Sequence, residues 1–319
     1  MDAKAPLRHQ DDGIANAMAG VRTQRQLAAL LRRLGIRPSR RRGQSFLVDH
    51  NLLDFIVRTG EVGPRDLALD IGCGTGLLTA HLAEAAGKVV GIEVDPQLLA
   101  IAARYVGARA NVELLRGDVL ASKHALAPEF LEKVWAEWEG GRYAALRVVA
   151  NLPYSIASLV VPNLLESDLP LTLIVVTVQK EVAERLAAPP GCGAYGSLSL
   201  IVQAHARVEV ARSVPPTVFW PRPKVESAIV RLEPRGDYLG QIADYATFVA
   251  TVRSAFALRR KTLANALQAA DLLAKGPGGR AVLAACGIAP QARAEHLGID
   301  HYVRLANALA SREPQQEER

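Results

Sequence analysis

The chain has 319 residues, half of them apolar, which suffices for one large domain and a smaller one. Its three cysteines are scattered and its seven histidines lack metal-ligand spacing, which argues against a disulfide framework and a metal site. The formal net charge is +6, and residues 1–43 hold ten basic but only three acidic side chains, so the positive charge gathers near the N-terminus.

The N-terminal region is expected to begin without regular structure. Residues 1–22 show no periodicity, and we predict that they are disordered. Leucines spaced three or four residues apart then predict a helix from Gln24, with Thr23 as its cap. The chain has no apolar run of about 18 residues and no signal-peptide pattern. We therefore expect a cytoplasmic protein without a membrane span.

A basic arm follows this predicted helix and contains Arg40, Arg41 and Arg42. Such charge runs are often solvated faces or tails. Here the arginines lead directly into the segment Gln44–Leu47, and the alternative is an arm that binds phosphate groups beside a functional site.

A glycine turn marks the first candidate binding site. A buried strand over residues 67–71 leads into Gly72 and Gly74 and then into a helix, as in nucleotide-binding units. The third glycine of the dinucleotide motif would fall at position 77, which is Leu77. Asp70 would repel a pyrophosphate but tolerates a cationic amino-acid group. The turn therefore favours S-adenosylmethionine over NAD.

Three later strands also end in polar residues, namely Glu93, Asp118 and Asn151. Glu93 follows Asp70 by 23 residues, close to the spacing at which a carboxylate holds ribose hydroxyls. Asp118 is placed to accept a hydrogen bond from the adenine amino group of the cofactor. A single such acid is more often a loop cap. Open α/β sheets bind ligands at the carboxyl ends of their strands, so four polar ends predict one shared crevice.

The run Asn151-Leu152-Pro153-Tyr154 predicts a second binding function at this crevice. Pro153 ends the strand and pushes Leu152 into an extended conformation. We expect the Asn151 side chain and the Leu152 carbonyl to face one point beside the Tyr154 ring. Two acceptors next to a ring suit an exocyclic amine such as N6 of adenine. A capping asparagine with a packed tyrosine is the structural alternative.

The second half of the chain is predicted to change from strands to helices. A fifth strand is expected over residues 171–178, and a hairpin-like pair over residues 197–214 and 225–232. The proline-stiffened loop between the pair carries Phe219, which we interpret as a base-stacking platform rather than a core side chain. From residue 236 helical patterns take over, so we expect a domain boundary there.

These segments resemble the ribosomal RNA adenine N6,N6-dimethyltransferase family over residues 25–312. The resemblance also rests on further motifs, which are residues 43–47, 178–182, 194–196, 214–227 and 259–262. It implies a Rossmann-like class I methyltransferase sheet with helices on both faces over residues 23–235. It also implies an all-helical RNA-binding domain over residues 236–312 and a frayed tail over residues 313–319.

The resemblance implies roles for individual residues. The cofactor S-adenosyl-L-methionine would be bound by the arm, the glycine turn and the strand ends: Gln44, Ser45, Leu47, Asp70, Gly72, Gly74, Glu93, Asp118 and Asn151. The catalytic set around the target adenine would be Asn151, Leu152, Pro153, Tyr154 and Phe219. RNA would be bound by Arg40, Arg41, Arg42, Arg222, Lys224, Arg259, Arg260 and Lys261. Ser45, Cys73 and Ala150 differ from the usual family residues, but no required functional group is lost.

The implied function is dimethylation of two adjacent adenosines in a hairpin loop near the 3′ end of small-subunit (16S) rRNA, with a role in small-subunit maturation. The implied partner is small-subunit rRNA or a pre-30S particle, bound by a monomer without metal or membrane. One alternative is an adenine methyltransferase acting on large-subunit rRNA or DNA. Another is a non-catalytic RNA-binding factor with the same fold, against which the intact acids and the Asn151–Tyr154 run argue.

Overall fold

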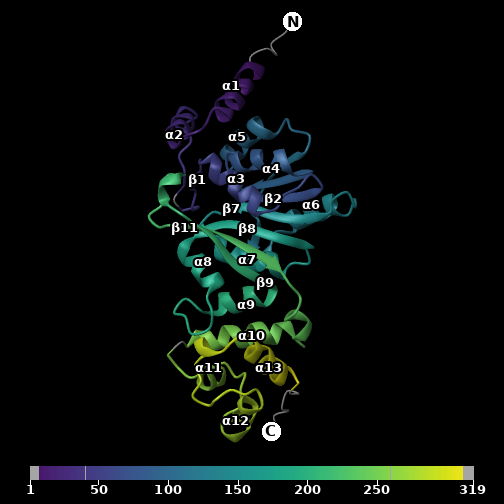
Figure 1. Cartoon of the computed structure of the whole chain (residues 1–319), viewed down its shortest axis with the longest axis vertical. Coiled ribbons are helices and arrows are strands. Elements are labelled where there is room, and N and C mark those ends of the chain that lie inside the picture. Colours follow the sequence, from purple (N-terminus) through teal and green to yellow (C-terminus); the bar gives the residue numbers. More distant parts are fainter. Residues whose placement is uncertain (1–6, 40, 259, 312–319) are drawn as a thin grey trace. The chain divides into compact units, whose positions relative to one another are not determined.

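The computed structural model describes residues 7–39, 41–258 and 260–311, with side chains from residue 13 onward (Figure 1). It divides into two compact units. The sheet unit comprises Met1–Ala183 and Glu209–Pro234, and the helical unit comprises Glu184–Val208 and Arg235–Arg319, each as far as the structure describes it. In these described ranges no helix has both the length and the apolar character needed to cross a membrane.

A seven-stranded sheet forms the centre of the sheet unit, in the order β4-β3-β2-β7-β8-β11-β9. Its strands are β2 (Asp66–Ile71), β3 (Lys88–Glu93), β4 (Val112–Arg116), β7 (Ala145–Asn151), β8 (Leu171–Gln179), β9 (Ala206–Val214) and β11 (Ser227–Pro234). The strands β4, β3, β2, β7 and β8 are parallel, whereas β11 pairs antiparallel with β8. The predicted α/β sheet is therefore confirmed.

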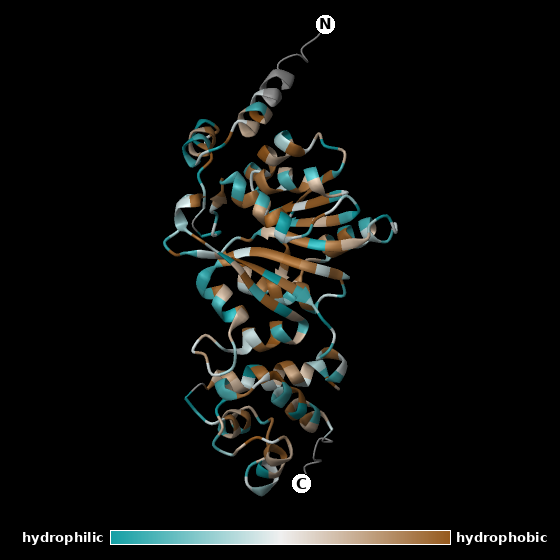
Figure 2. Cartoon of the chain, viewed as in Figure 1, coloured by the Kyte–Doolittle hydropathy of each residue, from teal (hydrophilic) through white to brown (hydrophobic). Residues whose placement is uncertain are grey.

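The sequence of the central strands explains why they form the core. Every residue of β2 is buried, and β8 is buried from Leu173 to Val178. Parallel strands covered on both faces need such continuous apolar runs, and Figure 2 shows the central strands in the brown of hydrophobic residues. Because β2, β3 and β7 are parallel, Asp70, Glu93 and Asn151 all lie at or next to the carboxyl-terminal edge of the sheet.

Helices pack against this sheet and bury alternate strand residues. Val89, Val149 and Val175 belong to one hydrophobic cluster with Ile56 and Leu82, which come from flanking helices. The helices of the sheet unit are α1 (Leu7–Ala19), α2 (Gln24–Arg33), α3 (His50–Thr59), α4 (Leu77–Ala85), α5 (Pro96–Val106), α6 (Pro128–Trp138), α7 (Ala157–Glu166) and the start of α8 (Lys180–Ala187). Successive side chains along a strand point to opposite faces of the sheet, so they reach the two helical layers in turn.

Two short ladders lie outside the main sheet. The strand β1 (Phe46–Leu47) pairs antiparallel with β10 (Phe219–Trp220), so that Leu47 lies opposite Phe219. The turn η1 (Pro216–Val218) precedes β10, and β5 (Leu120–Ser122) pairs with β6 (Ala125–Leu126). The β1–β10 ladder therefore connects the N-terminal arm to the proline-rich loop.

The prediction of disorder over residues 1–22 is wrong for the part that the structure describes. Leu7–Ala19 forms helix α1, which contacts α5, and the side chains of Met18 and Val21 are almost completely buried. These two residues join the same hydrophobic cluster as the sheet. Met18 and Val21 thus pack against residues that are distant in the sequence, and such contacts cannot be read from a local periodicity.

The helical unit contains five helices among its described residues in addition to the end of α8. They are α9 (Ser197–His205), α10 (Tyr245–Ala257), α11 (Leu263–Ala269), α12 (Pro277–Ala285) and α13 (Ile299–Ala310), with short turns η2 (Leu239–Gln241) and η3 (Ala294–His296). In the hairpin-like pair predicted over residues 197–214 and 225–232, the first half of the first member is wrong, because Ser197–His205 is helical. A continuous apolar run does not distinguish a buried strand from a buried helix.

The helical unit also begins earlier in the chain than expected. Leu200, Ile201 and Ala204 of α9 belong to the hydrophobic cluster of α10 and α13. The helical unit therefore includes residues 184–208, which the sequence analysis placed in the methyltransferase domain. Its second segment begins at Arg235, next to the domain boundary that was expected at residue 236. The predicted frayed tail over residues 313–319 lies outside the described residues.

Candidate functional site

A small cavity lies at the carboxyl-terminal edge of the sheet. It is lined by the β1 arm, the glycine turn, the start of α4 and the end of β7, with the residues Phe46, Leu47, Leu53, Asp70, Gly72, Cys73, Gly74, Thr75, Leu77, Leu78 and Asn151. The structure thus brings together five of the predicted site residues, which are Leu47, Asp70, Gly72, Gly74 and Asn151. Of the four polar strand ends predicted to share one crevice, Asp70 and Asn151 line this cavity, whereas Glu93 and Asp118 do not.

The glycine turn and the Asn151–Tyr154 run touch at Gly72. This glycine has a φ of +73°, and a Cβ atom there would lie 2.7 Å from Cδ of Pro153. Any side chain would be strained by the backbone conformation and would also displace the proline ring. The two motifs are separated by about eighty residues in sequence, yet they form one wall of the cavity.

Asp70 is a buried acid under the glycine turn. Its Oδ2 accepts a hydrogen bond of 2.7 Å from the hydroxyl of Thr79 on α4. Burial raises the pKa of Asp70 to about 7, the hydroxyl of Thr79 opposes this rise, and the neighbouring Glu93 adds to it. The carboxyl group at this position is therefore much easier to protonate than an exposed one.

Glu93 holds the glycine turn in place rather than lining the cavity wall. Its two carboxylate oxygens accept hydrogen bonds from the backbone N–H groups of Gly74, at 2.9 Å, and of Asp95, at 2.8 Å. Burial raises the pKa of Glu93, although these hydrogen bonds oppose the shift. The end of β3 is in this way attached to the turn that follows β2.

Asn151 presents an unsatisfied acceptor. Its Nδ2 donates a hydrogen bond of 3.1 Å to the carbonyl oxygen of Ser45, which fixes the orientation of the amide. Its Oδ1 is buried and has no hydrogen-bond partner. The hydroxyl of Thr177, the register partner of Asn151 on β8, is also buried without a partner. Buried acceptors without partners are costly, so this one points to a donor supplied by a ligand.

Tyr154 and Phe219 lie next to each other in an edge-to-face arrangement. Their ring centroids are 6.3 Å apart with an interplanar angle of 69°, and the hydroxyl of Tyr154 lies 2.5 Å from that of Ser227. The side chain of Phe219 is fully buried, so the prediction of an exposed aromatic platform is wrong for this residue. Pairing with β1 turns Phe219 into the core, where it packs against the Tyr154 ring.

The arm before β1 is attached to the edge of the sheet at several points. Asp95 accepts hydrogen bonds from Arg42 (2.7 Å) and Gln44 (3.1 Å) through the same oxygen. Gly43 has a φ of +63°, and a Cβ atom there would lie 2.9 Å from the backbone nitrogen of Tyr154. The hydroxyl of Ser45 donates to the carbonyl of Pro221 at 2.8 Å. Gln44 and Ser45 thus position the arm, and neither side chain lines the cavity.

The remaining predicted residues are not gathered at the cavity. Asp118 is exposed and accepts a hydrogen bond from the backbone of Leu120. Like Arg42, the other residues predicted to bind RNA are exposed where the structure describes them: Arg41, Arg222 and Lys224 in the sheet unit and Arg260 and Lys261 in the helical unit. Arg40 and Arg259 lie outside the described residues. Within the described part of the chain, no group of three or more histidine, cysteine, aspartate or glutamate side chains is arranged to hold a metal ion.

Sequence reasoning missed three residues that position the predicted ones. Thr79 bonds to Asp70, Asp95 holds Arg42 and Gln44, and Ser227 holds Tyr154. Asp95 carries a local signal, because it precedes Pro96 and caps α5, but that signal indicates only a helix start. No local pattern assigns a partner to Thr79 or Ser227.

The chain matches the family described as ribosomal RNA adenine dimethylase over residues 37–311. It is 41% identical over 289 residues to ribosomal RNA small subunit methyltransferase A of Geobacillus kaustophilus, covering 88% of this chain and 94% of that protein. The protein of the same name from Moorella thermoacetica is 39% identical over 295 residues, with 92% and 99% covered.

Two solved structures are also similar. A dimethyladenosine transferase from Plasmodium falciparum superposes with a TM-score of 0.66 at 25% identity, covering 82% of this chain and 95% of that one. The 23S rRNA methyltransferase ErmE superposes with a TM-score of 0.59 at 26% identity, covering 83% and 100%. The similarity therefore extends over almost the whole length of both solved structures.

Proposed function

Because the chain belongs to the ribosomal RNA adenine dimethylase family, we propose that it dimethylates N6 of two adjacent adenosines in small-subunit rRNA. The proposed methyl donor is S-adenosyl-L-methionine, and the proposed target is a hairpin loop near the 3′ end of that RNA. The names of the relatives at about 40% identity support the small subunit over the large-subunit RNA named for ErmE.

The observation that carries this proposal is the unpartnered Oδ1 of Asn151 in a cavity bounded by a glycine turn. The residues present fit the donor, because Gly72 and Gly74 leave the backbone accessible and Asp70 offers a carboxyl group without a competing cation. We propose that Leu47, Asp70, Gly72 and Gly74 hold the donor, with Glu93 supporting the turn. When bound, S-adenosyl-L-methionine supplies an electrophilic methyl group on its sulfonium.

Asn151 and Leu152 then act on the acceptor amine. The exocyclic nitrogen of adenine is a weak nucleophile because its lone pair is delocalised into the ring. Hydrogen bonds from its two N–H groups to the Asn151 Oδ1 and the Leu152 carbonyl would favour a tetrahedral nitrogen and localise that pair. These oxygen dipoles are oriented before the reaction, so they stabilise the positive charge that develops on nitrogen. The proton leaves to solvent afterwards, and no dedicated base is required.

Tyr154 is proposed to contact the target base, and Phe219 is proposed to support the Tyr154 ring, against which it packs. An adenine in a duplex does not reach such a pocket, so the base must be unpaired or extruded. Stacking on an aromatic side chain contributes about 1–3 kcal/mol per base.

The direct test is transfer of labelled methyl from S-adenosyl-L-methionine to purified small-subunit particles that lack the modification. We expect labelled N6,N6-dimethyladenosine by mass spectrometry of the RNA nucleosides, at two neighbouring positions mapped by primer extension. Label in large-subunit RNA alone would overturn the proposed substrate. No transfer to either RNA would favour a non-catalytic RNA-binding role.

Asn151→Ala is expected to lower kcat by about 100-fold or more, since it removes an oriented dipole that acts on the transition state. Cofactor affinity, measured by calorimetry, is expected to stay within a few-fold of the wild type. The matched control is Asn16→Ala on the exposed face of α1, which should leave both quantities unchanged. Near-normal turnover of Asn151→Ala would contradict the proposed role.

A further inference from the structure

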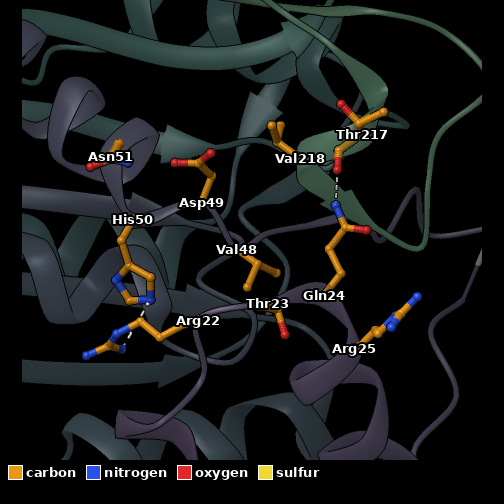
Figure 3. Close-up of a pocket in the computed structure, with 10 residues that line it drawn as sticks. All are labelled: Arg22, Thr23, Gln24, Arg25, Val48, Asp49, His50, Asn51, Thr217 and Val218. Carbon is orange, nitrogen blue, oxygen red and sulfur yellow. Dashed lines mark hydrogen bonds between the residues drawn. The ribbon is translucent and has the colours of Figure 1, made fainter.

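A second and much larger cavity lies in the sheet unit, outside the cofactor cavity. Its volume is about 710 Å³, within the range of small-ligand sites, and three segments line it (Figure 3). They are the turn into α2, the turn into α3 and the turn η1, which contribute Arg22, Thr23, Gln24, Arg25, Val48, Asp49, His50, Asn51, Thr217 and Val218. We call this cavity the arm pocket.

The arm pocket has the charge expected for an anion site. Arg22 and Arg25 lie on opposite sides of it in Figure 3, and Asp49 is its only acid. The carboxylate of Asp49 caps α3 by accepting a hydrogen bond from the backbone of Leu52 at 3.1 Å. The side chain of Arg25 is exposed and makes no hydrogen bond or ion pair with any other described residue. Its guanidinium therefore has all of its donors available to an anion.

A line of polar side chains supports the wall on the Arg22 side. Asp54 accepts from Nδ1 of His81 at 2.7 Å, and Nε2 of His81 lies 2.9 Å from Nδ1 of His50. Nε2 of His50 lies 2.7 Å from the carbonyl oxygen of Val21 and 3.3 Å from Nη1 of Arg22. The same Nη1 donates hydrogen bonds to the carbonyl oxygens of Ala19 at 2.9 Å and Val21 at 3.1 Å, so the other two nitrogens of this guanidinium are the ones that can bind an anion. This line fixes His50 and the turn that carries Arg22. It does not contact the residues proposed for catalysis.

The arm pocket adjoins the proposed adenine site through the β1–β10 ladder. Val48 donates a backbone hydrogen bond of 3.3 Å to Val218, which extends the pairing of Leu47 with Phe219. Val218 lines the arm pocket and Phe219 packs on Tyr154, yet consecutive Cα atoms are only about 3.8 Å apart. A residue that lines the arm pocket and a residue that packs on Tyr154 are therefore direct neighbours in the chain.

We propose that the arm pocket binds a backbone phosphate of the substrate RNA, on a nucleotide next to the target adenosine, through Arg22 and Arg25. This inference rests on the proposed RNA substrate and adds a contact that fixes the register of the strand. Phosphate contacts of this kind position a nucleic acid without reading its sequence.

The sharpest variant is Asn51→Asp, which adds a negative charge to the pocket without removing a contact. Asn51 is exposed, it has no hydrogen bond from its side chain to another described residue, and it occupies the first turn of α3. A carboxylate in the first turn of a helix is favourable, so the fold should be retained. We expect the KM for small-subunit RNA to rise about fivefold, the effect of a like charge at about 4 Å in water, with kcat unchanged.

The matched control is Asn16→Asp, which makes the same change on the exposed face of α1 outside the pocket. Equal KM values for Asn51→Asp and Asn16→Asp would overturn the proposal. A thermal melt of both variants checks that they are folded.

A second variant, Arg25→Gln, tests the phosphate contact directly by RNA binding without cofactor. The slope of log affinity against log salt should become shallower by about 0.7, the value for one lost phosphate contact to a single strand. The control Arg33→Gln, at the exposed end of the same helix, should keep the wild-type slope. An unchanged slope for Arg25→Gln would overturn the proposal.

Two further outcomes identify what has failed. If calorimetry detects inorganic phosphate binding to the wild type but not to Asn51→Asp, and RNA affinity is equal in both proteins, the pocket is a site for free phosphate and the RNA assignment is overturned. If the wild type binds the RNA with the expected dependence on Arg25 but transfers no methyl group, the proposed activity fails and the pocket assignment stands.

Discussion

Asp70 and Asn151 are polar side chains among apolar strands, where burial without a partner is unfavourable. Thr79 supplies the partner of Asp70, and the Ser45 carbonyl supplies a partner for only one end of the Asn151 amide. The other end of this amide keeps its hydrogen-bonding capacity for a ligand. At the scale of single residues, this difference separates a side chain that shapes the turn from the one that we propose acts on the substrate.

The raised pKa of Asp70 predicts a pH dependence of stability in the cofactor-free protein. Burial raises the pKa of Asp70 from 3.8 to about 7, so between these values the folded state binds a proton that the unfolded chain has released. This contribution to stability is fully present below about pH 4 and is lost as the pH rises to about 7. Asp70→Asn lacks it. The Tm of the variant relative to wild type should therefore increase from pH 5 to pH 7, and parallel Tm curves would contradict this.

At the scale of elements, the arm of residues 42–47 joins three parts of the site. Its backbone approaches the Asn151–Tyr154 run at Gly43, its strand β1 pairs with β10, and its Phe46 and Leu47 line the cavity that we propose for the cofactor. Asp95 at the start of α5 holds this arm through Arg42 and Gln44. Arg42, expected to bind RNA, forms an ion pair with Asp95 and stays half exposed.

Asp95→Asn is expected to loosen the arm. Partial burial opposes ionisation of Asp95, but Gln44, the backbone of α5 and Arg42 together lower its pKa, so the carboxylate is charged at neutral pH. Asparagine still caps a helix but cannot form the ion pair with Arg42. The free energy of unfolding should fall by at most about 1 kcal/mol, since the Arg42 side chain is half exposed. Limited trypsin cleavage after Arg41 and Arg42 should accelerate several-fold. The same change at Asp244, the cap of α10, is the control and should leave this rate unaltered.

At the scale of the whole molecule, the chain divides into two compact units, and the division does not follow the order of the sequence. The core of the helical unit takes α9 from the middle of the chain and combines it with the C-terminal helices. Tyr195, just before α9, is buried and donates its hydroxyl to the carbonyl of Leu297 at 3.0 Å. The chain therefore leaves the sheet unit, enters the helical unit, and returns for β9 to β11.

This division predicts how α9 unfolds. Its amides should exchange with solvent together with those of α10 and α13, because these helices share one core. Hydrogen exchange followed by mass spectrometry at increasing denaturant is the measurement. If α9 opened with β7 and β8 rather than with α10 and α13, the assignment of residues 184–208 to the helical unit would be wrong.

The sequence by itself determined the parallel strands, the glycine turn and the polar residues near the ends of β2, β3 and β7, because strands and tight turns follow from local pattern. Asp118 lies beyond the end of β4 instead. Those features were enough to place Asp70, Gly72, Gly74 and Asn151 at one cavity. Only the tertiary structure decided that Phe219 is buried, that residues 7–19 are helical, that α9 joins the other core, and that Arg22 and Arg25 line a pocket. Each of these depends on contacts between residues far apart in the chain, and no local periodicity encodes them.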